Sequence, residues 1–439
     1  MDGVPVADAL VLSHPEQLDR LRAACPEAVD TAVLAGDPCF DRILAARPYR
    51  ERFRRALGVR RGQKLVVLNS TWNPDSLFGD SGDSDHGGDT GDEDILPLLL
   101  PRLTAELPAD EYRLAAILHP NIWHGHGPGQ IRAWLDRARR AGLTLIDPLE
   151  GWRQALIAAD AVIGDHGSVT YYAAALGTPV LLGAAPLSGL DEEAPVADFV
   201  RTAPRLVPHD SPRAQLEALF AEHRPMAGPA EFTTSMPGES ARRLRRLFYA
   251  LMKLPEPASP ALLEPLPLPP YEPPTRSVPL RVLTRVRDLE TGEVTVRRYA
   301  EPSYEPVSDD EAHSAVPEDT RDLSRLDLAD VVLRHGPADD PRLGPPATWA
   351  AEVMGRHPHC ALAAYVTGPD TCVVRTRSGE CLTLTAADTG DADPAAYASA
   401  LYALLAGGRT VAETIRNGLI ARTGSETHHV SVRPVQASS

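Results

Sequence analysis

This 439-residue sequence contains no long apolar run and few cysteines. No segment approaches the roughly 18 consecutive apolar residues of a membrane-spanning helix, and the first residues lack the basic start and apolar core of a secretion signal. The five cysteines are odd in number and form no Cys-x-x-Cys pair, which argues against a disulfide framework and a structural zinc site. We therefore expect a soluble, cytoplasmic protein with reduced thiols.

Several catalytic signatures are also missing. The sequence has no phosphate-binding loop of the Gly-x-x-x-x-Gly-Lys-Ser/Thr type, no Gly-x-Ser-x-Gly elbow, no His-Glu-x-x-His pair and no kinase motif set. No Gly-x-Gly-x-x-Gly follows the first strand of the expected sheet, so NAD binding has no support. We expect no cofactor.

Positive charge is in deficit. The formal net charge is −16, which disfavours a general binder of nucleic acid or anionic membrane, because both require a basic face. One basic pocket for a small phosphorylated ligand remains compatible with this balance. We expect no nucleic-acid partner.

What the sequence does contain is a regular alternation of apolar runs and helical segments from about residue 64 to 185. Uninterrupted apolar runs are typical of strands buried on both faces, and the helices between them supply the crossovers of a parallel sheet. We therefore predict an α/β fold with a doubly wound parallel sheet. Its expected strands are 64–71, 112–120, 143–149, 161–167 and 179–185, with an amphipathic helix over 128–142.

Composition divides the rest of the chain. Residues 6–36 read as strand, helix and strand, so we expect 1–60 to be the remnant of an incomplete N-terminal Rossmann-like domain. A second Rossmann-like domain is expected over 61–254. Beyond it we expect a proline-rich linker over 255–275, a separate small α+β domain over 276–425 and a frayed tail over 426–439. The composition identifies no partner for the last domain.

One segment inside the sheet region, residues 78–94, is rich in Gly, Ser and Asp and has no apolar periodicity. We interpret it as a mobile loop between the first strand and the first helix. Its carboxylates leave a calcium site open as an alternative, but their spacing matches no EF-hand loop. No metal site is therefore predicted.

The most informative segment is 161–183, where a buried strand ends at a polar turn and a helix begins. Ser168 is a suitable N-cap, and the free amides of the first helical turn would attract a phosphate. Ordinary capping of a strand–helix junction explains the same pattern equally well. The residues expected to contribute to a phosphate site are Asp165, His166, Gly167, Ser168, Val169 and Thr170.

Two further polar segments are expected at the same sheet edge, because parallel strands place their carboxyl ends together. His119 directly follows a strand, where it can act as an acid, a base or a phosphate ligand near neutral pH. A zinc site at His124 and His126 is the rival interpretation, and it lacks a third ligand nearby. Thr71 and Trp72 follow the first strand. A plain strand-end turn is the alternative for each segment taken alone.

Four segments, in this order, resemble the C-terminal half of GT-B-fold transferases, closest to the CDP-glycerol glycerophosphotransferase-like group. They are GDPCFDRIL (36–44), LVVLNSTWNPDS (65–76), AAILHPNI (115–122) and the run from DPLEGW to ALGTPVLL (147–182). The resemblance covers roughly residues 6–254 and does not extend to 276–439.

This resemblance implies that 61–254 is a nucleotide-binding domain and that the chain is a transferase. Its donor would be a nucleotide-activated polyol phosphate or sugar, bound without a metal. His119 would be the catalytic residue at the activated phosphate. The donor phosphate site would include Asp165, Ser168 and Val169, with Thr71 and Trp72 at its border.

Two departures keep other functions open. The family has Tyr-Ser where this chain has His166-Gly167, and residues 1–60 carry no His-Gly-Thr-Pro motif for the acceptor side. A non-catalytic nucleotide-binding or interaction protein is therefore the second hypothesis. A UDP-sugar epimerase is the third, because Asp37 and Asp165 make a poor acid–base pair. Composition favours a turn and a helix cap at Asp37 and Asp41 over a place in a cleft.

Overall fold

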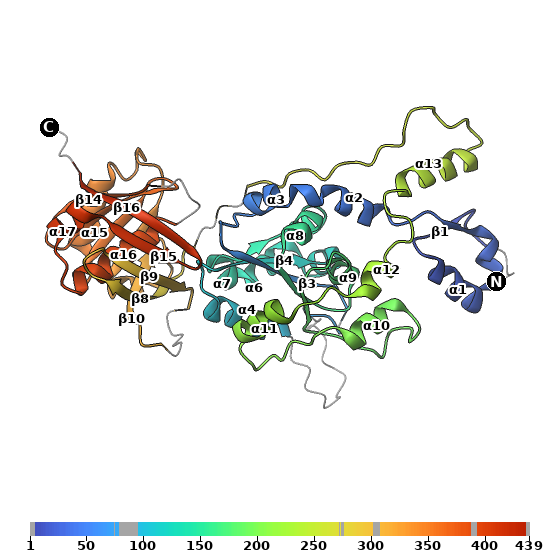
Figure 1. Cartoon of the computed structure of the whole chain (residues 1–439), viewed down its shortest axis with the longest axis horizontal. Helices are drawn as coiled ribbons and strands as arrows, with labels where there is room; N and C mark the ends of the chain where they lie inside the picture. The colour runs from blue at the N-terminus through green and yellow to red at the C-terminus, as the bar shows by residue number, and fades with distance from the viewer. Residues whose placement is uncertain are drawn as a thin grey trace.

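The computed structural model describes residues 5–73, 75–78, 95–271, 273, 276–301, 308–387 and 393–435. Figure 1 shows a helix-covered parallel sheet at the centre of the molecule, with a β-barrel on one side and a small N-terminal unit on the other. Within the described ranges, no helix is long and apolar enough to cross a membrane. The loop predicted over 78–94, with its calcium alternative, lies outside the described residues except for residue 78.

The central sheet has five strands, all parallel, in the order β5-β4-β3-β6-β7. Strand β3 shows why an uninterrupted apolar run suits this position. Leu65 and Val67 pack into one core, while Val66 and Leu68 pack into the other. The predicted doubly wound parallel sheet is confirmed. Its strands are β3 (Lys64–Ser70), β4 (Tyr112–Leu118), β5 (Thr144–Leu145), β6 (Ala161–Gly164) and β7 (Val180–Leu182).

Strand β5 is shorter than the strand predicted over 143–149. The backbone turns at Asp147, whose carboxylate accepts hydrogen bonds from the amides of Leu149 (2.9 Å) and Glu150 (3.0 Å). A side chain that bonds its own following backbone offers the chain a turn in place of a sheet ladder. The strand therefore ends at Leu145, and the residues around Asp147 form a turn instead.

Helices cover both faces of this sheet (Figure 1). One core holds residues of α2, α3, α8, α9 and α10, and the other holds residues of α4 to α7 and α11. The single helix predicted over 128–142 is divided at Leu135. The helices are α2 (Pro38–Ala46), α3 (Arg50–Ala56), α4 (Ile95–Glu106), α5 (Pro120–His126), α6 (Pro128–Trp134), α7 (Asp136–Arg140), α8 (Trp152–Ala158), α9 (Ser168–Ala175), α10 (Pro195–Thr202) and α11 (Pro212–Glu222).

The N-terminal unit consists of β1 (Leu10–Leu12), α1 (Pro15–Ala24) and β2 (Ala32–Leu34), which confirms the strand, helix and strand read from the sequence. The two strands pair in parallel, and α1 buries none of its residues. The chain returns to this unit after α12 (Ala227–Phe232), where the Ser235 amide donates to the Ser13 carbonyl (3.0 Å).

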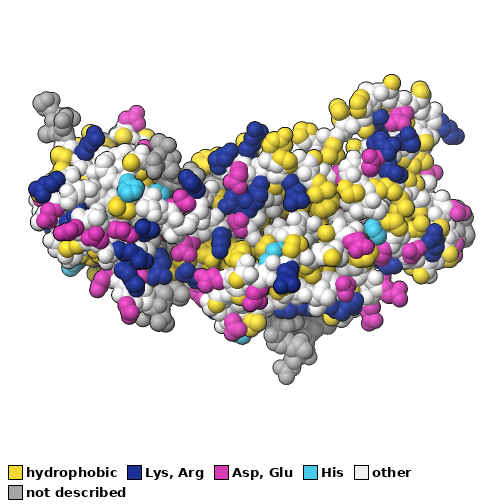
Figure 2. All heavy atoms as spheres, in the orientation of Figure 1, with side chains coloured by type: hydrophobic (Ala, Val, Ile, Leu, Met, Phe, Trp, Pro, Cys, Tyr) yellow, Lys and Arg dark blue, Asp and Glu magenta, His cyan; other side chains and the backbone are white. Residues whose placement is uncertain are grey.

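Helix α13 (Ser240–Leu251) follows and is strongly amphipathic, but only Ser240 is buried. Figure 2 shows Lys and Arg side chains on the side of this helix that faces the viewer, with hydrophobic side chains around them. The large apolar side chains exposed here and just beyond the helix are Phe248, Leu251, Met252 and Leu254. Much of the apolar face of α13 is therefore exposed, because the rest of the protein covers only the start of the helix.

The C-terminal part is a closed barrel of nine strands in the order β10-β11-β12-β13-β14-β16-β15-β9-β8. The hairpin and the three later strands read from the sequence are confirmed as β8–β9 and β12–β14, while the closure was not predicted. The strands are β8 (Leu280–Asp288), β9 (Glu293–Tyr299), β10 (Glu311–Pro317), β11 (Val331–His335), β12 (Leu362–Val366), β13 (Thr371–Thr376), β14 (Cys381–Ala386), β15 (Leu419–Thr423) and β16 (Glu426–Pro434).

The prediction that the chain frays from residue 426 is wrong. Residues 426–434 form β16, which pairs with β14 on one side and β15 on the other and so completes the barrel. Helix α16 (Ala395–Ala406) is apolar all round and packs against β8, β9 and β15 as well as β11 to β13, so the strands surround it. The remaining helices here are α14 (Leu323–Asp327), α15 (Pro346–Arg356) and α17 (Val411–Asn417).

Buried charges join the barrel to the sheet domain. Arg298 of β9 is 1% exposed, and its guanidinium contacts Asp110 of the sheet domain (3.1 Å) and Asp393 before α16 (2.9 Å). Arg60 of the sheet domain also pairs with Asp393 (3.3 Å). Burial would raise the pKa of Asp393, but Arg298 and Arg60 hold it well below the usual range.

Candidate functional site

The three polar segments meet at one sheet edge. Strand β3 lies between β4 and β6, so the residues that follow these strands, Thr71, His119 and Asp165, come from neighbouring positions. The chain order of the strands reverses on either side of β3, and such a switch point is where doubly wound sheets form a crevice. The sequence expectation that these segments converge is therefore met by the topology.

Asp165 is the organising residue of this edge. It is fully buried, and its carboxylate accepts hydrogen bonds from the amides of Thr71 (2.7 Å), Leu77 (3.2 Å) and Gly167 (3.0 Å). Burial raises the pKa of Asp165, while these amide bonds act in the opposite direction. Its carboxylate is thus committed to holding the loop after β3 against the start of α9.

Thr170 is also an internal support. It is fully buried, and its hydroxyl accepts a hydrogen bond from the Asn69 side chain (2.9 Å). A Cβ atom on Gly164 would lie 2.2 Å from the Thr170 hydroxyl oxygen, so the end of β6 needs a glycine there. Asp165 and Thr170 therefore support the loops of the site through internal hydrogen bonds.

The start of helix α9 is open. Gly167, not Ser168, is the N-cap, and no side chain caps the helix. The amides of Ser168, Val169 and Thr170 have no acceptor within the helix, since a helix leaves its first amides unpaired. Ser168 itself is exposed. The positive end of the helix dipole and these amides make this tip attractive to an anion.

His119 follows β4 at the same sheet edge, with β3 between it and the β6–α9 junction. It is the N-cap of α5, and its Nδ1 accepts a hydrogen bond from the Asn121 amide (3.1 Å). This bond leaves the proton of a neutral ring on Nε2. Burial lowers the pKa of His119, and the nearby Asp165 carboxylate raises it. A neutral imidazole with a free Nε2–H is a hydrogen-bond donor for a ligand.

Trp72 forms the outer wall of the site. It is 56% exposed, and its ring centre lies 6.3 Å from that of His119. On the opposite side, His166 Nε2 contacts the Asn73 side chain (3.2 Å), while His166 Nδ1 is buried without a partner. We had not assigned Asn73 to the site. Its position in the polar run after β3, directly beyond Trp72, is the signal that would have identified it.

The other candidate residues lie elsewhere or have structural roles. His126 packs against the Trp134 ring (5.0 Å), and among the described residues no three His, Cys, Asp or Glu side chains are grouped to hold a metal. Asp37 caps α2 through the Phe40 amide (2.9 Å) and accepts the Tyr172 hydroxyl (2.7 Å).

Asp41 is buried and accepts hydrogen bonds from the amides of Gly238 and Ser240, at the start of α13. The cap expected at Asp37 is confirmed. Asp41 caps a helix as well, although the helix is distant in sequence.

No family model matches the chain, and no curated protein matches it. Among solved structures, the wall teichoic acid polymerase TagF is similar at 16% identity, over 56% of this chain and 58% of that chain, with a TM-score of 0.40. UDP-GlcNAc 2-epimerase from Neisseria meningitidis is similar at 15% identity, over 56% and 61% of the chains, with a TM-score of 0.33.

A glycosyltransferase from Rickettsia africae is similar at 10% identity, over 56% and 64%, with a TM-score of 0.31. The chain thus spans less than two thirds of each of these proteins. Over 56% of its length the chain is similar to a polymerase, an epimerase and a glycosyltransferase.

Proposed function

We propose that the chain is a GT-B-like transferase whose sheet edge binds the diphosphate of a nucleotide-activated polyol phosphate or sugar. The observation that carries this proposal is the uncapped start of α9 after β6 and the imidazole of His119 after β4, at the same sheet edge on either side of β3. Two kinds of anion-binding group, backbone amides and a neutral imidazole donor, thereby lie at the sheet edge where doubly wound sheets bind their ligands.

In this proposal the groups have separate tasks. The amides of Ser168, Val169 and Thr170 hold the donor phosphates, and the helix dipole stabilises the charge that grows as the phosphate ester departs. The neutral His119 ring donates a hydrogen bond from Nε2 to the phosphate of the departing nucleotide and so stabilises its charge. Trp72 and Thr71 border the ligand. Asp165, which we first assigned to ligand contact, instead keeps these loops in register, and no metal or cofactor takes part.

A non-catalytic nucleotide-binding protein is the second candidate, and one observation favours it. The single histidine before β3 is His14, which caps α1 through the Glu16 amide (3.1 Å) and packs on Phe232. Within residues 5–63, no histidine is thus free to serve as the base for an acceptor. An epimerase is less well supported, because both of its candidate carboxylates, Asp37 and Asp165, are held by internal hydrogen bonds.

The experiment compares two histidine variants by ligand-induced stabilisation. CDP-glycerol, UDP-sugars and GDP-sugars are tested by thermal shift, where a ligand at 100 times its Kd adds about 2.7 kcal/mol to the free energy of unfolding. His119→Asn removes the imidazole but retains a good N-cap for α5. The matched control is His124→Asn, on an exposed position of the same helix.

We expect one donor class to stabilise the wild type and the His124 variant but not the His119 variant. An unchanged shift in His119→Asn, or no shift with any donor, contradicts the proposed site. Release of nucleotide from the stabilising donor then separates the two candidates: a transferase releases it in the presence of an acceptor, and a binding protein does not.

A further inference from the structure

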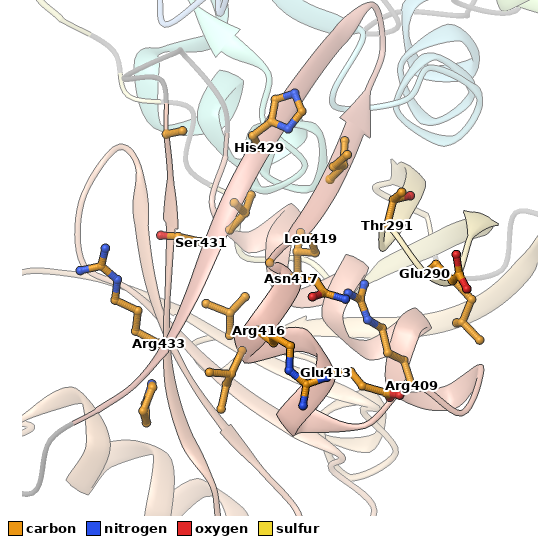
Figure 3. Close-up of a pocket in the computed structure, with 18 of the residues that line it drawn as sticks. Glu290, Thr291, Arg409, Glu413, Arg416, Asn417, Leu419, His429, Ser431 and Arg433 are labelled. Carbon is orange, nitrogen blue, oxygen red and sulfur yellow. The ribbon is translucent and has the colours of Figure 1, made fainter.

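The barrel contains a second polar pocket, remote from the sheet edge. It has a volume of about 1190 Å³ and lies between α17, strands β15 and β16, and the turn that joins β8 to β9 (Figure 3). Three arginines and two glutamates line it, so its lining is net positive although the chain as a whole carries a net charge of −16. The side chains used below are Arg409, Glu413, Arg416, Asn417, Ser431 and Arg433.

Arg409 is the unusual member of this lining. It is 4% exposed, and its two terminal nitrogens are buried without a hydrogen-bond partner. A buried guanidinium normally has an acceptor for its protons, because leaving it unpaired is costly. Burial lowers the pKa of Arg409, and the nearby carboxylates of Glu413 and Asp288 raise it. Arg409 therefore has carboxylates nearby, but no acceptor within hydrogen-bond distance of its two terminal nitrogens.

The backbone makes room for this guanidinium. A Cβ atom at Gly292 would lie 1.8 Å from Arg409 Nη1, so the head group rests against the bare backbone of the β8–β9 turn. Gly292 also has a φ of 74°, which favours glycine. Figure 3 shows the Arg409 head group directed toward the carboxamide of Asn417 and the turn at Thr291. The β8–β9 turn thus leaves space for the Arg409 guanidinium.

Two further arginines add to the charge. Arg416 on α17 and Arg433 on β16 are exposed and line the same pocket. Neither forms a hydrogen bond or ion pair within the described structure, in contrast to Arg285, Arg297 and Arg334 of this barrel.

The acidic side is already committed. The carboxylate of Glu413 accepts hydrogen bonds from the amide (2.8 Å) and hydroxyl (2.7 Å) of Thr410, in a capping box at the start of α17. Its charge is therefore directed at the helix start. Glu290 lines the pocket as well, so three arginines face two glutamates and the lining keeps one net positive charge.

We propose that this pocket binds a phosphorylated small molecule, with Arg409 as the buried donor and Arg416 and Arg433 as outer cations. A phosphate carries close to two negative charges and several acceptors, which suits guanidinium groups that present paired N–H donors. Asn417 and Ser431 supply neutral polar groups at the same wall. The site is separate from the α9 tip and does not depend on the proposed transferase function.

The test is isothermal titration with inorganic pyrophosphate. The main variant is Arg416→Ala/Arg433→Ala, since both side chains are exposed and their removal leaves the fold intact. Arg409→Gln is the second variant, with circular dichroism to check its folding. The matched control is Arg325→Ala, an exposed arginine of α14 that does not line the pocket.

We expect the double variant to weaken pyrophosphate binding by about tenfold or more, as two charge-assisted contacts are lost. Arg325→Ala retains the wild-type affinity. His119→Asn, which alters only the sheet edge, also retains binding at this pocket. Wild-type protein that fails to bind pyrophosphate overturns the proposal. A second result also overturns the proposal: pyrophosphate still binds the double variant but no longer binds His119→Asn. That result would assign the ligand to the sheet edge.

Discussion

At the end of β6, the absence of a side chain at Gly164 lets Thr170 bring its hydroxyl to Asn69. We predict that Gly164→Ala destabilises the protein by about 1–3 kcal/mol, because the added methyl overpacks a filled core. Urea unfolding measures the change. The control is Gly129→Ala in α6, where a Cβ meets nothing within 4 Å. Equal stability of the two variants would show that the β6–α9 junction is not tightly packed.

His313 of β10 is a buried histidine whose ring nitrogens have no hydrogen-bond partner among the described residues. It is 5% exposed, both ring nitrogens lack hydrogen bonds, and its ring centre lies 4.4 Å from that of Tyr402. Burial lowers the pKa of His313 to about 3, whereas in the unfolded chain its pKa is about 6.5. The unfolded state therefore binds more protons between these values. Stability is fully present above pH 6.5 and is lost as the pH falls toward 3.

We accordingly predict that His313→Phe, which keeps a ring against Tyr402, has a flatter pH profile. Between pH 6.5 and 4.5 the wild type should lose about 2–3 kcal/mol relative to the variant, at about 1.4 kcal/mol per pH unit. Urea unfolding at a series of pH values measures the difference. The exposed His209 provides the control variant His209→Phe. Parallel profiles for wild type and His313→Phe would show that His313 is protonated in the folded protein.

At this scale the sequence predicted which residues meet at the sheet edge, but not which of them are buried there. Thr71, His119 and Asp165 were expected together because each follows an apolar run, and strand ends share an edge. That Asp165 is buried was not predictable, since it depends on the amides of Thr71 and Leu77, which are about ninety residues away in the chain. Side-chain direction at a strand end is set by such distant loops.

Among the elements, β16 is the strand that closes the barrel. It is the last strand in sequence but lies between β14 and β15, so the barrel is closed only when it is present. We predict that truncation after residue 425 abolishes cooperative unfolding of the barrel, because the ladders that β16 forms with β14 and β15 are lost and the barrel is left open. Truncation after 435 keeps both ladders and should leave the transition unchanged. Differential scanning calorimetry of the two chains decides this, and a retained barrel transition in the shorter one would contradict it.

The elements of the central sheet could be predicted because their signal is local. An apolar run such as Leu65–Leu68 has no polar interruption, because its side chains alternate between the two hydrophobic cores on either face of the sheet. The barrel could not be predicted because its closure is long-range. For example, β9 pairs in parallel with β15, which lies more than a hundred residues later. Fraying is predicted for 426–439 because chain ends are often poorly ordered, yet Val430 and Val432 are buried.

For the whole molecule, the decisive contact is the ion cluster around Arg298. We predict that Arg298→Met destabilises the protein by about 3–5 kcal/mol, because it leaves the buried carboxylates of Asp110 and Asp393 without their main partner. The barrel and the sheet domain should then unfold in two separate calorimetric transitions. The neighbouring Arg297, which pairs with Asp310 and is partly exposed, is the matched control, and Arg297→Met should cost less than about 1 kcal/mol. A single, unshifted transition in Arg298→Met would show that this cluster does not join the two parts.

The closed ring of the barrel limits how anything can attach to it. Each of its nine strands has a neighbour on both sides, so its backbone amides and carbonyls are used within the ring. A peptide therefore cannot join this part of the molecule by extending a sheet, and the barrel offers no template for fibre growth. Recognition by this half of the chain has to proceed through side chains and the loops between strands.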